Sequence, residues 1–304
     1  MRSVVVDRND TAAVTAALGG GCDVLVDCVA YHAGHAQQLI GLGDRIGSVV
    51  AVSTVAVYAD TSGRDFFGPA GSWPDLPLGI TEDQPTVPPS DCNYGARKVA
   101  LEQALLATDR FPVTVLRPGG LYGRHSHYPR EWYFVKRALD CRPYRIIARG
   151  GRSHFHTTSA RNLAELVRLA AEQPGNRVLN AGDPDPPTVR EIGEIIFATL
   201  GHSAEEVLIE GDPPSRSVGD TPWSVPRSVV MDISAAERQL GWRPVERYAE
   251  AVRDAVAWMV DVSRGRDWED VFAYFYANQG DEAFDYAAED SWIAANRPTS
   301  SCPR

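Results

Sequence analysis

A continuous apolar run that ends in two hydroxyl residues constrains the fold of this chain most. Residues 48–58 read Ser-Val-Val-Ala-Val-Ser-Thr-Val-Ala-Val-Tyr. A strand with apolar side chains on both faces is typical of a parallel sheet covered by helices on both sides. Ligands of such sheets bind beyond the carboxyl ends of the strands, so Ser53 and Thr54 are candidate site residues. The alternative is that a strand-end hydroxyl only caps the following turn.

Strand and helix patterns alternate along the chain to about residue 183, which predicts an α/β fold. Further strands are expected at 23–30, 113–117 and 177–183. The early cluster Gly19–Gly21 follows a helical pattern that Asp10 or Thr11 would cap, and we interpret it as a helix end and turn. Residues 60–92 are rich in proline and glycine, and a loop of this length is usually functional or disordered.

Tyr94 and Lys98 form the pair with the clearest chemical meaning. Their spacing of four residues places both side chains on one face of a helix. A lysine ammonium beside a tyrosine favours the phenolate, and such a tyrosine exchanges a proton at a carbinol or carbonyl. The alternative is an ordinary solvated helix face.

Length and composition predict a soluble enzyme, and the cysteines predict a cytoplasmic one. The chain has 304 residues, of which 44% are hydrophobic, and a net charge of −10 that argues against nucleic-acid binding. No stretch reaches the roughly 18 apolar residues of a membrane span, and no secretory pattern opens the chain. The cysteines are odd in number and widely spaced, which favours free thiols over disulfides or zinc: Cys22, Cys28, Cys92, Cys141 and Cys302.

Four segments, in order, resemble the extended short-chain dehydrogenase/reductases, the NAD-dependent epimerase/dehydratase family. Residues 23–30 resemble the family's fourth strand, and Val52–Tyr58 resemble its Ser-Ser-x-x-Val-Tyr motif. Tyr94 and Lys98 match its active-site pair. Residues 113–123 resemble its sixth strand and the Arg-Pro-x-x-x-Tyr-Gly loop that follows. The resemblance covers most of residues 1–260.

The resemblance implies a Rossmann-like doubly wound parallel sheet, a smaller C-terminal substrate lobe and an NAD or NADP cofactor. The resemblance implies that Tyr94 is the general acid/base and that Thr54 orients the substrate oxygen. It implies that Lys98 lowers the pKa of Tyr94 and binds the nicotinamide ribose. A hydride would then pass between the substrate carbinol carbon and the nicotinamide. The cofactor contacts expected by resemblance are Asp7, Arg8, Val29, Ala30, Ser53, Lys98 and Pro118.

The family's opening strand and glycine-rich phosphate loop have no match here. The chain is expected to begin at the family's third strand, Ser3–Asp7, so that the first two strands are missing and cofactor binding is doubtful. We expect either a truncated product, which we favour, or a natural variant with a rebuilt cofactor site. Either way the strand at 23–30 has an exposed edge at Val24 and Val26.

The predicted domains are an incomplete Rossmann-like domain at 1–183, substrate-lobe elements and a closing helix at 184–260, and an acidic aromatic tail at 262–304. Capping boxes are expected at Thr188 with Glu191 and at Ser234 with Glu237, the second helix ending at Gly241. The tail has no family counterpart. Its aromatic residues either pack as a helix pair or form the subunit contact of a homodimer.

Histidine pairs and an arginine cluster are candidate ligand-binding groups. His125 and His127 follow the loop that faces substrate in the family, so substrate contact is expected rather than a metal site. Arg145, Arg149 and Arg152 are expected either to bind an anionic substrate, such as the diphosphate of a sugar nucleotide, or to be surface charge.

The predicted function is that of an NAD(P)-dependent epimerase/dehydratase or reductase acting on a carbinol or carbonyl substrate. Two alternatives stay open. One is a cofactor-free binding or regulatory protein that kept the fold, and the other is a cofactor-independent isomerase or dehydratase that uses the tyrosine.

Overall fold

The structure is a computed structural model that describes residues 3–69 and 71–296 and divides into two compact units. Unit 1 comprises Met1–Gly120, Ala160–Asp183 and Val229–Val245. Unit 2 comprises Leu121–Ser159, Pro184–Ser228 and Glu246–Arg304. The units interleave along the chain, whereas the domains predicted at 1–183, 184–260 and 262–304 are contiguous.

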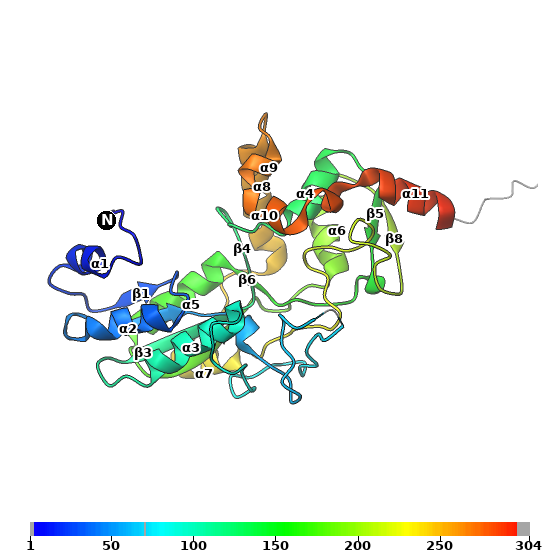
Figure 1. Ribbon diagram of the computed structural model, residues 1–304. Coiled ribbons are helices and arrows are strands. Elements are labelled where there is room, and N and C mark those ends of the chain that lie inside the picture. The colour runs from blue at the N-terminus through cyan, green and yellow to red at the C-terminus, as the bar shows by residue number, and fades with distance from the viewer. Residues whose placement is uncertain (1–2, 70, 297–304) are drawn as a thin grey trace, which may run out of the picture. The chain divides into compact units, whose positions relative to one another are not determined.

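A four-stranded parallel sheet forms the centre of unit 1 (Figure 1). Its strand order is β1-β2-β3-β7, and all three strand pairs are parallel. The strands are β1 (Leu25–Asp27), β2 (Val49–Val52), β3 (Val113–Pro118) and β7 (Arg177–Ala181). The predicted α/β fold with a parallel sheet is confirmed.

Alternate residues of β2 enter two separate cores, which explains why the strand is apolar throughout. Val49 and Ala51 pack in one core with residues of helices α2 (Ala33–Gly41) and α3 (Tyr94–Leu106). Val50 and Val52 pack in the other with residues of α5 (Ala160–Glu172) and α7 (Ser234–Leu240). Because successive side chains of a strand point to opposite faces, the sheet is covered by helices on both sides.

The amino-terminal segment corrects one prediction. Residues 3–7 form no strand, and Val5 is 98% exposed. An isolated apolar segment stays out of a sheet when no neighbouring strand offers hydrogen-bond partners. The strand predicted at 23–30 is confirmed only as β1, which pairs on one side with β2 and leaves Val26 41% exposed.

Helix α1 (Thr11–Leu18) confirms the interpretation of the early glycines. The Asp10 carboxylate accepts a hydrogen bond from the Ala13 amide at 3.0 Å and caps the helix. Gly19 ends it with φ +63°, a conformation that favours glycine. The glycine cluster is therefore a helix end and not a phosphate-binding loop.

Unit 2 is built around an aromatic core. Its helices are α4 (Trp132–Leu139), α6 (Val189–Thr199), α8 (Tyr248–Ser263), α9 (Trp268–Val271), α10 (Ala273–Gln279) and α11 (Tyr286–Asn296). Strand β4 (Gly120–Tyr122) pairs with β6 (Thr157–Ser159), and β5 (Tyr144–Ile147) pairs with β8 (Glu205–Leu208). Phe272 and Phe275 of the tail are buried in this core beside α4 and α8 residues, so these aromatic groups have the expected packing role.

Of the two predicted capping boxes, one is confirmed and one is wrong. The Thr188 hydroxyl accepts from the Glu191 amide while the Glu191 carboxylate accepts from the Thr188 amide. At α7 the N-cap is Ile233 and not Ser234. The Ser234 amide donates a hydrogen bond to the Asp232 carboxylate at 2.8 Å. Gly241 ends α7 with φ +67°, as predicted.

Candidate functional site

The carboxyl end of β2 presents two hydroxyl groups. The Ser53 hydroxyl is buried and has no hydrogen-bond partner among the residues that the structure describes. The Thr54 hydroxyl accepts from the Ala56 amide at 3.2 Å and caps the short helix η2 (Val55–Val57). A hydroxyl that accepts one hydrogen bond still has its own hydrogen to donate. Capping and substrate binding by Thr54 are therefore compatible.

Tyr94 and Lys98 lie on one face of α3. The Asn93 side chain caps the helix by accepting from the Ala96 amide at 2.9 Å, so Tyr94 is the first helical residue. The Lys98 ammonium lies 5.9 Å from the centre of the Tyr94 ring. It also donates to the Ala30 and Val52 carbonyl oxygens at 2.6 and 2.8 Å. Lys98 thus connects α3 to the segments that end β1 and β2.

Gly95 allows the start of α3 to approach the turn after β2. A Cβ atom at this position would lie 2.3 Å from the Ala56 carbonyl oxygen, closer than any side chain can come. Ala56 is two residues beyond Thr54, so this contact brings the helix that carries Tyr94 against the turn that carries Thr54. A glycine is required here by the close approach of two backbones.

Burial changes the acid–base behaviour of Lys98. Desolvation lowers the pKa of its ammonium to about 8, while Asp27 and Glu102 act in the opposite direction. Lys98 is only 4% exposed, yet the two carbonyl oxygens give the charged form strong hydrogen-bond acceptors. The group is therefore a cation near neutral pH that loses its proton more readily than a surface lysine does.

A buried polar network holds the next turn of α3, and the sequence prediction missed it. Arg117, near the end of strand β3, donates to Glu102 of α3 at 2.6 Å, and both side chains are almost fully buried. The guanidinium lies 4.9 Å from the centre of the Tyr58 ring. The Tyr58 hydroxyl in turn donates to Asn180 of β7 at 2.6 Å. The available signal was the position of Glu102, one helical turn beyond Lys98 and on the same face.

Asp27 organises the loop after β1. One carboxylate oxygen accepts from the Val29 and Ala30 amides at 3.0 and 2.7 Å, and the other accepts from Arg8 at 2.7 Å. Among the predicted cofactor residues, Arg8 therefore forms an ion pair with Asp27, and the Ala30 carbonyl oxygen accepts a hydrogen bond from Lys98. The Asp7 carboxylate accepts from the Asn9 amide at 2.8 Å in an exposed turn.

The described residues fit only one end of a dinucleotide. Ser53, Tyr94 and Lys98 offer polar groups of the kind that a ribose and a carboxamide bind, and Pro118 ends the neighbouring strand β3. The early glycine cluster does not supply the diphosphate end, because Gly19 ends helix α1 instead of beginning a helix.

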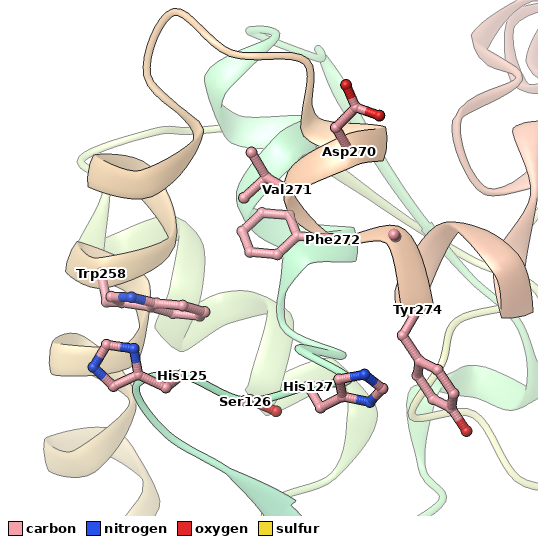
Figure 2. A pocket seen from close by; sticks show the side chains of 9 residues that line it. His125, Ser126, His127, Trp258, Asp270, Val271, Phe272 and Tyr274 are labelled. Carbon is pink, nitrogen blue, oxygen red and sulfur yellow. The ribbon is translucent and has the colours of Figure 1, made fainter. Parts of the chain in front are cut away.

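The two histidines predicted to contact substrate lie in unit 2. His125 and His127 line a hollow of about 360 Å³ (Figure 2). The His125 ring lies 5.4 Å from Trp258 of α8, and the His127 ring lies 4.4 Å from Tyr274 of α10. His125 has φ +62°, which costs a non-glycine residue roughly 1 kcal/mol and is frequent at functional sites.

The arginines predicted to bind an anion already have carboxylate partners within unit 2. Arg145 contacts Glu206 at 2.7 Å, Arg149 contacts Asp212 at 2.9 Å, and Arg152 contacts Glu210 at 2.5 Å. An anionic ligand would have to compete with these carboxylates. The sequence could not show the pairing, because each partner lies about 60 residues further along the chain.

Within residues 3–69 and 71–296, no group of three or more histidine, cysteine or acidic side chains is placed to hold a metal ion. No helix in these ranges is long and apolar enough to cross a membrane. Cys22, Cys28, Cys92 and Cys141 are free thiols, and Cys302 lies outside the described residues.

No family model matches the chain. Sequence relatives include two dTDP-glucose 4,6-dehydratases, from Neisseria meningitidis and Neisseria gonorrhoeae, which are 27% and 26% identical over 218 residues. These matches cover 69% of this chain but only 57% and 58% of the two dehydratases. A 5'-nucleotidase SurE from Vibrio parahaemolyticus is 28% identical over 202 residues, or 60% of this chain and 72% of the relative.

Solved structures give the fold independently. The dTDP-glucose 4,6-dehydratase of Bacillus anthracis in complex with NAD matches with a TM-score of 0.63 and 19% identity, over 86% of this chain and 81% of that one. The Streptomyces venezuelae dehydratase DesIV matches with a TM-score of 0.62 and 22% identity, over 88% and 81% of the two chains. The predicted resemblance to the NAD-dependent epimerase/dehydratase enzymes and the predicted Rossmann-like fold are confirmed.

Proposed function

We propose that this chain carries the active-site residues of an NAD-dependent epimerase or dehydratase acting on a nucleotide sugar. The observation that carries the proposal is the Tyr94–Lys98 face of α3, held at the carboxyl ends of β1 and β2 by the two Lys98–carbonyl hydrogen bonds. Ligands of parallel sheets bind at this edge.

In this proposal Tyr94 exchanges a proton with the substrate oxygen. The positive charge of Lys98 favours the phenolate form of Tyr94, and the Thr54 hydroxyl donates a hydrogen bond that orients the same substrate oxygen. The hydride acceptor for such chemistry is a nicotinamide, which Ser53 and Lys98 would hold. The position of Thr54 after β2 and the hydrogen bond from Lys98 to the Val52 carbonyl support these roles.

The substrate class is proposed from the relatives. The two sequence relatives are dTDP-glucose 4,6-dehydratases, and the solved structures include complexes with NAD and a UDP-glucuronic acid epimerase with its substrate. Since the chain spans under three fifths of the dehydratases' length, the activity of the whole proteins is carried over only as a proposal.

The test is turnover of dTDP-glucose with excess NAD, followed by NMR of the sugar product. Tyr94→Phe removes only the proton-carrying hydroxyl, and we expect turnover to fall by roughly 10²–10⁴-fold with the fold intact. Tyr31→Phe is the matched control, because that ring lies 5.5 Å from Tyr94 and loses the same atom. Equal losses in the two variants, or near-normal turnover in Tyr94→Phe, would contradict the proposed role.

A second candidate is a cofactor-free binding protein with this fold. The observation in its favour is that the early glycines end helix α1 instead of beginning a helix, so they offer a diphosphate no helix N-terminus. For the 304-residue chain we accordingly expect weak or no binding of NAD and NADP in calorimetry. Micromolar binding of either cofactor would remove this candidate, and turnover without added nucleotide would favour a cofactor-independent isomerase or dehydratase.

A further inference from the structure

Two histidine rings are stacked at the start of helix α2. The centres of the His32 and His35 rings lie 4.0 Å apart, and the ring planes are inclined by 28°. Each ring accepts a hydrogen bond from a backbone amide through its Nδ1 atom. His35 accepts from Tyr31 at 2.9 Å, and His32 accepts from Gly34 at 3.1 Å. The two rings therefore hold the turn that leads from β1 into α2.

The hydrogen bonds of His35 fix its protonation state. A backbone amide can only donate, so the Nδ1 atom that faces Tyr31 carries no proton. The Nε2 atom lies 3.0 Å from the side-chain oxygen of Asn9, whose side-chain nitrogen donates to Asp7 at 3.3 Å. Nε2 therefore donates to Asn9, and His35 is a neutral ring with its one proton on Nε2.

A second proton on His35 would face the Tyr31 amide donor to donor. His35 is only 8% exposed, so water cannot readily replace the hydrogen bond that is lost. The His32 ring would meet the same conflict at Gly34, because its Nδ1 atom caps α2 by accepting from that amide. The positive end of the α2 dipole also opposes a charge here. Both backbone hydrogen bonds thus require neutral rings.

The charged groups around His35 act mainly against a charge on its ring. Burial lowers the pKa of His35, and the positive charge of Arg8 acts in the same direction. His32 and Lys98 of α3 lower this pKa further, whereas Asp27 at the end of β1 raises it. Asp27 already has Arg8 as its ion-pair partner at 2.7 Å. The neutral ring is therefore the favoured form at neutral pH.

We propose that these two histidines form a pH-sensitive clamp, which holds Tyr31 beside Tyr94 while both rings are neutral and releases it when they are protonated. The centres of the Tyr31 and Tyr94 rings lie 5.5 Å apart, and the central guanidinium carbon of Arg97 lies 5.6 Å from the Tyr31 ring centre. Tyr31 is thus fixed through its amide by His35 and through its ring by α3. The effect on catalysis rests on the proposed function, whereas the clamp itself does not.

The test is NMR spectroscopy of the 304-residue chain, titrated from pH 8 to pH 5. At pH 8 the ring nitrogen shifts of His35 should show a neutral ring with its proton on Nε2. On acidification the Tyr31 amide should shift with the same midpoint as the His35 ring, below the ordinary histidine value of about 6.5. Its protection from hydrogen exchange should fall roughly 5- to 100-fold, because a hydrogen bond is lost. A proton on Nδ1 at pH 8, or a Tyr31 amide unchanged across the titration, would overturn the clamp.

Two variants separate the clamp from a general effect of pH. His35→Asn puts an amide oxygen as many bonds from the backbone as Nδ1, and this oxygen accepts but does not titrate. We expect its Tyr31 amide to become independent of pH. His202→Gln is the matched control, because the His202 Nε2 atom donates to the Arg142 carbonyl oxygen at 2.9 Å, so a second proton costs no hydrogen bond. The control should keep the full pH response at Tyr31, and its loss there would contradict the clamp.

His32→Asn is a second test that does not depend on folding of His35→Asn, since asparagine is a preferred helix cap. In this variant the Gly34 amide should lose its pH response while the Tyr31 amide keeps its own, and a Gly34 response like that of the original protein would contradict the clamp. Turnover below about pH 6.5 should fall more steeply in the original protein than in His35→Asn; equal slopes would overturn the link to Tyr94. The NMR readouts need no turnover, so failure of the Tyr94 test leaves them unaffected.

Discussion

The lowered pKa of Lys98 has a measurable consequence for stability. In an unfolded chain a lysine titrates near 10.5, and in the folded protein burial lowers the Lys98 pKa to about 8. Between these values the unfolded state binds more protons than the folded state, so the free energy of unfolding rises with pH. Between pH 7 and pH 10 the rise from this one group is about 2.5 kcal/mol.

The assay is urea unfolding at pH 7, 8, 9 and 10 for the protein and for Lys98→Met. Cys28 acts on Lys98, and burial raises the pKa of its own thiol, so both proteins should carry Cys28→Ser. The difference in unfolding free energy between the two proteins should grow by about 2.5 kcal/mol in favour of the lysine form. Above pH 10 the free energy of unfolding of both proteins should fall alike, because burial raises the pKa of Tyr58 to about 12 and an unfolded tyrosine ionises first. Parallel pH profiles for the two proteins would refute the reasoning.

Two further predictions concern packing and local stability. Gly95→Ala should destabilise the protein by about 1–3 kcal/mol and lower turnover, because its Cβ would meet the Ala56 carbonyl. The control is Gly41→Ala, at a helix position with open space around it. Chemical unfolding of this control should show a free energy of unfolding that is about 0.5–1 kcal/mol higher. Hydrogen exchange measured by mass spectrometry should be fast in residues 3–30 and slow in 113–117, since β1 is an edge strand and β3 has neighbours on both sides. Uniform protection from residue 3 onward would contradict the second prediction.

The sheet and helix α3 could be predicted because local signals agreed with the tertiary structure. The run Val49–Val52 is apolar on both faces, and both faces are in fact covered. The Tyr94–Lys98 spacing predicts a shared helix face correctly, because the Asn93 side chain caps a helix that begins at Tyr94. The segment Ser3–Asp7 has the same valine-rich composition as β2 but forms no strand, since strand formation needs a partner that local sequence does not specify.

Partners distant in sequence explain why the ion pairs of unit 2 could not be predicted. Arg145, Arg149 and Arg152 form an obvious basic cluster in the sequence, yet carboxylates at 206–212 neutralise them. The number of arginines in a segment therefore says little about anion binding until the partners are known.

The proposed catalytic tyrosine is held in place by polar contacts on two successive turns of its helix. Lys98 fixes the first of these turns to the Ala30 and Val52 carbonyls, and Glu102 fixes the next to Arg117 of β3. Each contact is buried, so loss of one partner would leave an uncompensated polar group and a large penalty. The helix therefore has little freedom to shift along the sheet, and this restricts the position of Tyr94, its first residue. A proton relay needs this kind of positional precision.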